Sequence, residues 1–286
     1  MTSTPWTIPG AGGEPILGDA HVPPGEPHGV VLVAHGFKGY KDYGMFPRIA
    51  SVLADAGFVS HRFNFSHSGM TNAIDTFERP DLFERDTWNK QVADLAAVVR
   101  AVAGTALSGA GLPLVLFGHS RGGVAVLLTA GRHAGDASFP RPAGVITAAA
   151  PSRCNALPEE HARLLLEAGY LESPSARTGQ MLRVGRVFLE EQLDDPPGHD
   201  LLALAARIRC PVLVAHGASD STVPCACAGE LVRAIGPAAR ELIVDGANHV
   251  FDTPNPLPPD AAPSAALRAL LDASVAFARE TCEARL

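Results

Sequence analysis

Short runs of β-branched and aliphatic residues alternate along this chain with longer segments of helical period. This alternation is typical of βαβ units, in which successive strands lie parallel and the connecting helices cover the sheet. Residues 29–34 have no polar side chain, as expected for a central strand that is buried on both faces. The pattern therefore predicts an α/β protein with a mainly parallel central sheet and helices on both faces.

The other elements follow from the same two periods. Further parallel strands are expected at 58–63, 113–117, 143–149, 211–215 and 241–244. Helices are expected at 46–54, 92–102, 122–131 and 261–285. At the N-terminus, the fragments 6–8 and 15–17 flank a glycine-rich stretch and predict a hairpin at the edge of the sheet. Residues 1–286 are therefore expected to form a single domain.

One segment, residues 152–209, interrupts the alternation. No strand is expected in it, and its apolar spacing indicates two helices at 159–168 and 179–193. An insertion of this length is too long for a structureless loop. We therefore expect a helical lid or cap, or a segment that packs against the sheet.

Composition and charge limit which binding partners and which cellular location are expected. The formal net charge is −7, and the chain has no cluster of lysine and arginine, so neither nucleic acid nor an anionic membrane is an expected partner. The first thirty residues lack the basic and apolar regions of a secretory signal, and no apolar stretch approaches the length of a membrane span. A cytoplasmic location is the expectation.

The cysteines indicate neither disulfides nor a metal site. Five cysteines are an odd number, spread through a chain too large to depend on disulfides, so reduced thiols are expected. Cys225 and Cys227 form the one close pair, and no second Cys or His pair accompanies them. We therefore expect no metal.

The motif Gly118-His-Ser120-Arg-Gly122 lies where an expected buried strand ends and an expected helix begins. A turn this tight forces the serine into a strained backbone conformation and leaves no room for side chains two positions before and after it. The Ser120 hydroxyl is thereby exposed at a helix N-terminus, where developing negative charge is favoured. Ser120 is the candidate nucleophile.

A serine needs a base, and the base needs an acid that orients it. His249 follows the last expected strand, and Asp220 is the only carboxylate in the loop after the strand at 211–215. Both positions are at carboxyl ends of strands, where sites lie in open parallel sheets. Asp245 is the competing acid, but it lies at the end of the last strand rather than in the preceding loop.

At these residues the sequence resembles the α/β-hydrolase superfamily, and within it the compact serine esterases of the dienelactone-hydrolase-like and cinnamoyl-esterase-like branches. The order Ser120, Asp220, His249 matches the family's nucleophile, acid and base. The resemblance also implies that the loop His35-Gly36-Phe37 supplies an oxyanion hole, in which the backbone N–H of Phe37 pairs with that of Arg121.

Three further histidines are candidates for the substrate pocket. His35 and His119 each lie beside a glycine of a motif, and a hydrogen-bonded wall of the site is the expected role. His67 lies in the loop after a strand, where it is a candidate for substrate contact, although a structural role is the simpler interpretation.

Together these features predict hydrolysis of a small carboxylic ester through an acyl-enzyme, without a metal or an organic cofactor. The same residues would also serve a thioesterase, an amidase or a perhydrolase, since the leaving group is not visible in the sequence. A third interpretation, from another class, is a catalytically silent receptor that binds a small molecule in the same pocket.

Overall fold

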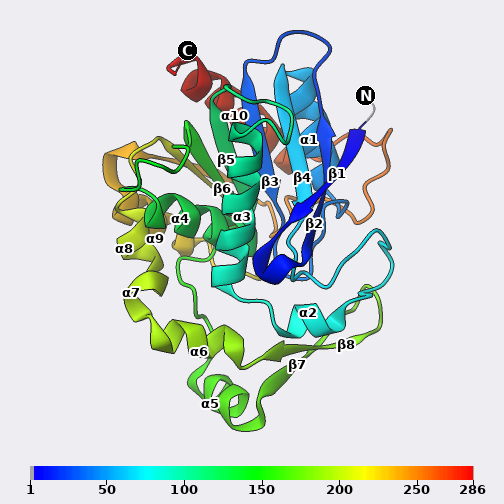
Figure 1. Ribbon diagram of the computed structural model, residues 1–286, viewed down its shortest axis with the longest axis vertical. Coiled ribbons are helices and arrows are strands. Elements are labelled where there is room, and N and C mark those ends of the chain that lie inside the picture. Colours follow the sequence, from blue (N-terminus) through cyan, green and yellow to red (C-terminus); the bar gives the residue numbers. More distant parts are fainter. Residues whose placement is uncertain (1–2, 286) are drawn as a thin grey trace.

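The computed structural model describes residues 3–285. Its main element is an eight-stranded sheet in the order β1-β2-β4-β3-β5-β6-β9-β10 (Figure 1). The strands are β1 (Ser3–Pro9), β2 (Pro15–His21), β3 (Gly29–Ala34), β4 (Phe58–Asn64), β5 (Leu114–His119), β6 (Gly144–Ala148), β9 (Val212–Gly217) and β10 (Ala239–Val244). Within the sheet, β4, β3, β5, β6, β9 and β10 are neighbours in this order and run parallel. Strand β2 pairs antiparallel with β1 on one side and with β4 on the other. The mainly parallel sheet and its edge hairpin are confirmed.

Helices cover both faces of this sheet (Figure 1). One face packs against α1 (Phe46–Asp55) and α10 (Ala265–Glu283). The other packs against α3 (Trp88–Ala103), α4 (Arg121–Arg132), α8 (Leu201–Ala205) and α9 (Ala226–Ile235). The strands separate two apolar cores, which is why β3, at the centre of the sheet, has no polar side chain.

Local sequence signals set several helix boundaries. Helix α1 buries Phe46, Ile49 and Leu53, the stripe that its spacing indicates. Thr87 caps α3 by accepting a hydrogen bond from the N–H of Lys90, and Ser264 caps α10 in the same way. Each cap satisfies a backbone donor that a helix leaves without a partner at its start.

The first part of segment 152–209, from α5 (Glu159–Ala168) to α6 (Val187–Asp194), extends beyond the carboxyl ends of the strands, at the lower end of the molecule in Figure 1, and the segment then returns to the sheet at α8. It contains α5, β7 (Tyr170–Pro174), β8 (Met181–Gly185), α6, α7 (Pro196–His199) and α8. Strands β7 and β8 form an antiparallel hairpin. Helix α5 is where the sequence predicts it, but the expectation of a segment without strands is wrong.

The helix predicted at 179–193 is wrong in its first half. Gly179 adopts φ +70° in the turn of the hairpin, which ends any helical run there. Leu182 is buried while Met181 is 55% exposed, so the side chains alternate with the period of a strand. Leu182 packs against Phe77 and Phe83, contacts that local periodicity cannot reveal.

Long-range hydrogen bonds fasten the hairpin to the rest of the domain. The Gln180 side-chain amide accepts from the N–H of Phe77 at 2.8 Å and donates to its carbonyl at 3.0 Å. Lys38 Nζ donates to the carbonyl of Pro174 at 2.7 Å. Near the end of β8, a side chain at Gly185 would meet the backbone of α2 (Pro80–Glu84) at 2.5 Å, so the two elements pack directly.

Helices α2, α7, α8 and α9 have no counterpart among the sequence-based expectations. In the part of the chain that the structure describes, no helix has both the length and the apolar character that crossing a membrane requires.

Candidate active site

Ser120 lies in a strained turn between β5 and α4. Its backbone adopts φ 54° and ψ −121°, a conformation that side-chain-bearing residues rarely adopt. A Cβ at Gly118 would lie 2.2 Å from the carbonyl of Gly122, and a Cβ at Gly122 would lie 2.5 Å from that of Ala34. These distances are too short for a side chain, which explains why the motif has glycine two positions before and two positions after the serine.

The structure brings Ser120, His249 and Asp220 together. His249 Nε2 lies 3.0 Å from Ser120 Oγ, and His249 Nδ1 lies 2.8 Å from Asp220 Oδ2. The residues come from the carboxyl ends of β5, β9 and β10, which are far apart in the chain. Because a carboxylate only accepts, His249 Nδ1–H donates a hydrogen bond to Asp220, and the unprotonated Nε2 is left to accept a hydrogen bond from the Ser120 hydroxyl.

Asp220 is held as a carboxylate by donors on both oxygens. Oδ1 accepts from the backbone N–H groups of Thr222 and Val223, at 2.8 and 2.9 Å. Burial alone would raise the pKa of Asp220, but the Val223 N–H, His249 and the Thr222 N–H outweigh it and lower that pKa below its ordinary value. Asp220 therefore stays ionised beside His249.

His216, in β9, is a neighbour that the sequence does not single out. It is fully buried, and its Nε2 lies 3.2 Å from Asp220 Oδ2 and 3.0 Å from the carbonyl of Val223. Its only sequence signal is its place four residues before Asp220, at the end of an apolar strand. Asp245, the competing acid, is exposed.

His119 lines the smaller cavity beside Ser120, whereas His35, predicted as a wall of the site, lines neither of the two cavities at Ser120. Both are neutral, hydrogen-bonded side chains. His119 Nε2 donates to the carbonyl of His249 at 2.8 Å, and burial together with the nearby His249 lowers the pKa of His119 to about 3. His35 Nδ1 donates to the carbonyl of Gly36, and burial lowers the pKa of His35 to about 4. Neither ring is available as a base at neutral pH.

His67 lies apart from these residues. Its Nδ1 is 2.8 Å from the hydroxyl of Ser66, which in turn donates to Asp94. Among residues 3–285, His67 does not belong to the set that lines either cavity beside Ser120. This placement agrees with a structural role for His67 and does not support a contact between His67 and the substrate.

The loop after β3 lies directly against the candidate nucleophile. A Cβ at Gly36 would be 2.9 Å from Ser120 Cβ, so the backbone of the next residue, Phe37, lies next to the serine. The N–H of Arg121 belongs to the first turn of α4, where the helix offers no acceptor. Both proposed oxyanion donors therefore flank Ser120.

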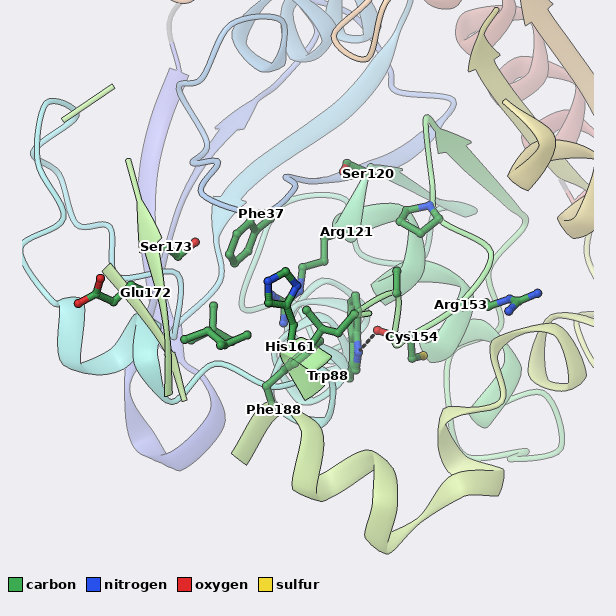
Figure 2. A pocket seen from close by; sticks show the side chains of 15 residues that line it. Phe37, Trp88, Ser120, Arg121, Arg153, Cys154, His161, Glu172, Ser173 and Phe188 are labelled. Carbon is green, nitrogen blue, oxygen red and sulfur yellow. Dashed lines mark hydrogen bonds between the residues drawn. The ribbon is translucent and has the colours of Figure 1, made fainter. Parts of the chain in front are cut away.

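Two cavities meet at Ser120 and Phe37. The larger measures about 500 Å³ and is mainly apolar, with Trp88, Val184 and Phe188 among its walls (Figure 2). Most of its lining comes from segment 152–209, whose start is fixed by a 3.1 Å hydrogen bond from Trp88 Nε1 to the carbonyl of Cys154. The smaller cavity measures about 180 Å³, and His119, His249 and Lys38 line it.

No metal centre is evident in the described chain: within residues 3–285, no three His, Cys, Asp or Glu side chains are grouped closely enough to hold an ion. All five cysteines are free.

Comparison with models of known families shows to which family this chain belongs. Residues 25–181 match the model of the serine aminopeptidase, S33 family. The chain belongs to this family of α/β hydrolases. The S33 match includes Ser120 and the loop at Phe37 but ends before Asp220 and His249, so their place in the site rests on the geometry above.

Solved structures give the same fold over nearly the whole S33 chain. The esterase domain of a Rhodothermus marinus protein is 23% identical with a TM-score of 0.65, covering 98% of this chain and 99% of that one. Est1E from Butyrivibrio proteoclasticus with bound ferulic acid is 18% identical with a TM-score of 0.70, covering 96% and 98%. Dienelactone hydrolase from Anabaena variabilis is 17% identical with a TM-score of 0.62, covering 97% of each chain. A search of curated proteins by sequence finds no match.

Proposed function

We propose that this α/β hydrolase is a serine esterase that cleaves a carboxylic ester through an acyl-enzyme. The observation that carries the proposal is the unbroken chain of contacts from Ser120 Oγ through the His249 ring to Asp220 Oδ2. A serine hydroxyl is a weak nucleophile, and this chain supplies the base that accepts its proton and the anion that stabilises the charged base.

In the proposed first step, Ser120 Oγ bonds to the ester carbonyl carbon as its proton passes to His249 Nε2. The carbonyl oxygen becomes an oxyanion that accepts hydrogen bonds from the backbone N–H groups of Phe37 and Arg121. The intermediate collapses when the C–O bond to the alcohol breaks and His249 returns the proton to the leaving oxygen. Water then attacks the acyl-enzyme with His249 as base, which releases the acid and restores Ser120.

The two cavities suggest where each part of the ester binds. His249 must reach the leaving oxygen, and among the two cavities His249 lines the smaller one. The alcohol portion is therefore assigned to the cavity of about 180 Å³, and the acyl portion to the apolar cavity of about 500 Å³. In this proposal segment 152–209 acts as a cap over the acyl cavity within a single domain.

The description of the S33 family also raises cleavage of an N-terminal residue from a peptide. An aminopeptidase must bind the substrate's ammonium group, but the enclosed charge of the larger cavity is the guanidinium of Arg121, whereas the carboxylate of its lining, Glu172, is exposed. A cation there repels an ammonium. This observation favours an ester over a peptide, and the esterase domain and the ferulic acid complex among the fold relatives support the same choice.

Turnover of p-nitrophenyl esters of increasing acyl length tests the proposal. We expect hydrolysis by the wild type and its loss in Ser120→Ala, with Ser173→Ala as the matched control because Ser173 lines the same cavity. Undiminished turnover by folded Ser120→Ala contradicts the proposal. Saturable ligand binding by a wild type that turns over no ester would instead indicate the silent receptor.

A further inference from the structure

The side chain of Arg121 is enclosed by aromatic rings at the wall of the larger cavity. Its Cζ lies 4.6 Å from the ring centre of Trp88, 4.5 Å from that of Phe188 and 5.3 Å from that of Phe37. Only 11% of the side chain is exposed. Figure 2 shows it running from the Ser120 end of the cavity in among the other lining residues.

This guanidinium is poorly satisfied by the protein. Nε and Nη2 are buried and make no hydrogen bond with the described residues. The nearest carboxylate oxygen, Asp86 Oδ2, is 3.4 Å from Nη2 but accepts its hydrogen bond from Gln91 at 2.6 Å. The remaining nitrogen, Nη1, is not fully buried. It also has no hydrogen-bond acceptor among residues 3–285. Buried charged donors are expensive to leave without acceptors, so this arginine is set up for an acceptor that the protein does not supply.

The charges around the cavity favour an anionic acceptor. Burial raises the pKa of Asp86 to about 6 despite the nearby Arg121, so Asp86 is mostly ionised at neutral pH, but it offsets the Arg121 charge from 3.4 Å without accepting a hydrogen bond from it. The other charged side chains of the cavity, Arg153 and Glu172, are exposed, and Arg153 points away from the other lining residues in Figure 2. His161 also lines this cavity and is exposed. Arg121 is thus the enclosed charge of the cavity.

We propose that Arg121 selects acyl groups that end in a carboxylate, so that the preferred substrate is a monoester of a dicarboxylic acid. The inference rests on the proposed function, which assigns the acyl group to the cavity that Arg121 lines. The apolar spacer packs against Trp88 and Phe188, and the terminal carboxylate accepts from Nη1 of Arg121. The role belongs to the side chain and is separate from that of the Arg121 backbone N–H.

Paired substrates test this role. We would measure kcat/KM for monoethyl adipate and for ethyl hexanoate, which share the ester and the chain length and differ in the terminal carboxylate. A charge-assisted hydrogen bond in a desolvated site corresponds to about a 10- to 100-fold preference for monoethyl adipate. A succinate-to-suberate series then locates the best spacer length.

Variants assign the preference to Arg121. In Arg121→Met, which keeps an apolar stem but loses the charge, the ratio of the two kcat/KM values should fall about 10- to 100-fold. Any disturbance of the oxyanion site affects both esters and cancels in this ratio. Arg153→Met removes an arginine from the same cavity and should change the ratio by less than about threefold, because an exposed charge is screened.

The outcomes are distinct. A wild type that hydrolyses both esters equally, or an Arg121→Met enzyme that loses both in parallel and keeps the ratio, overturns the inference and assigns Arg121 a structural role. If Arg121→Met does not fold, competition decides: adipate should inhibit the wild type at least about tenfold more strongly than hexanoate, and equal inhibition overturns the inference. If the wild type hydrolyses no ester, the proposed function fails, and calorimetric binding of adipate against hexanoate still tests Arg121.

Discussion

Asp220 Oδ2 lies 2.8 Å from His249 Nδ1, although the two residues are 29 positions apart in the sequence. Asp245 is far closer to His249 in sequence, yet its side chain is exposed. The backbone N–H groups of Thr222 and Val223 hold the other oxygen of Asp220 and so fix the direction of the carboxylate. In the proposed mechanism the loop after β9, rather than the end of β10, therefore provides the acid.

Replacing this acid should therefore lower turnover far more than replacing its neighbour in sequence. In Asp220→Asn the amide can donate to His249 Nδ1, which favours the wrong tautomer, and we expect kcat to fall by about 10⁴-fold. The matched variant Asp245→Asn should keep kcat within about threefold, as an exposed charge contributes little. Equal losses in the two variants would contradict the assignment of the acid.

The backbone strain at Ser120 predicts a gain in stability when the residue is changed to glycine. Glycine adopts φ 54° without steric conflict, so Ser120→Gly should raise the free energy of unfolding by about 1 kcal/mol while abolishing ester turnover. Ser120→Ala retains a Cβ and should give no comparable gain. Chemical denaturation of the three proteins measures the difference, and a Ser120→Gly protein less stable than Ser120→Ala would refute the prediction.

Buried histidines predict that acid destabilises the fold. Burial lowers the pKa of five of them. These are His21, His35, His61, His67 and His119. Each binds a proton more readily when unfolded, so its contribution to stability is present above about pH 6.5 and is lost as the pH falls toward its folded pKa. Asp86 and Asp94, whose pKa values burial raises to about 6, act in the opposite direction between about pH 4 and 6, but they are fewer.

We therefore expect Tm to fall between pH 7 and pH 5. His61, whose pKa is lowered to about 4, donates to the carbonyl of Ser108 outside the site, so His61→Gln can keep that hydrogen bond and should flatten the dependence. A Tm that is constant or rises on acidification is incompatible with neutral buried histidines.

The hairpin β7–β8 should loosen when its attachment to the domain is removed. Gln180→Ala eliminates both side-chain hydrogen bonds to Phe77, so we expect a higher KM for esters with long acyl groups and faster proteolysis between residues 170 and 185. Thr178→Ala, in the same turn, is the control because its side-chain hydroxyl bonds only within the turn. Identical cleavage rates in both variants would show that the Gln180 contacts do not restrain the hairpin.

The sheet and the three residues of the candidate triad are predictable from sequence because their signals are local. Residues 29–34 are apolar on both faces, and the glycines around Ser120 are required by contacts within that turn. Positions at the carboxyl ends of parallel strands must then converge, which is why Asp220 and His249 could be named without coordinates.

The features that the sequence does not predict depend on contacts between segments that are distant in the chain. Leu182 is in a strand because Phe77 and Phe83 cover it, and its own neighbours in sequence fit a helix equally well. The sequence indicates a role for the N–H of Arg121, but only the packing of Trp88 and Phe188 shows that its side chain is enclosed at a cavity. His216 is similarly hidden by the apolar strand that carries it.

Labelling with a fluorophosphonate, followed by mass mapping of the modified peptide, tests the central claim most directly. The account predicts a single covalent adduct at Ser120, formed by the wild type and by Ser173→Ala, and strongly slowed in Asp220→Asn because His249 then no longer accepts the serine proton. Folded protein that remains unlabelled, or that is labelled at a different residue, would contradict it.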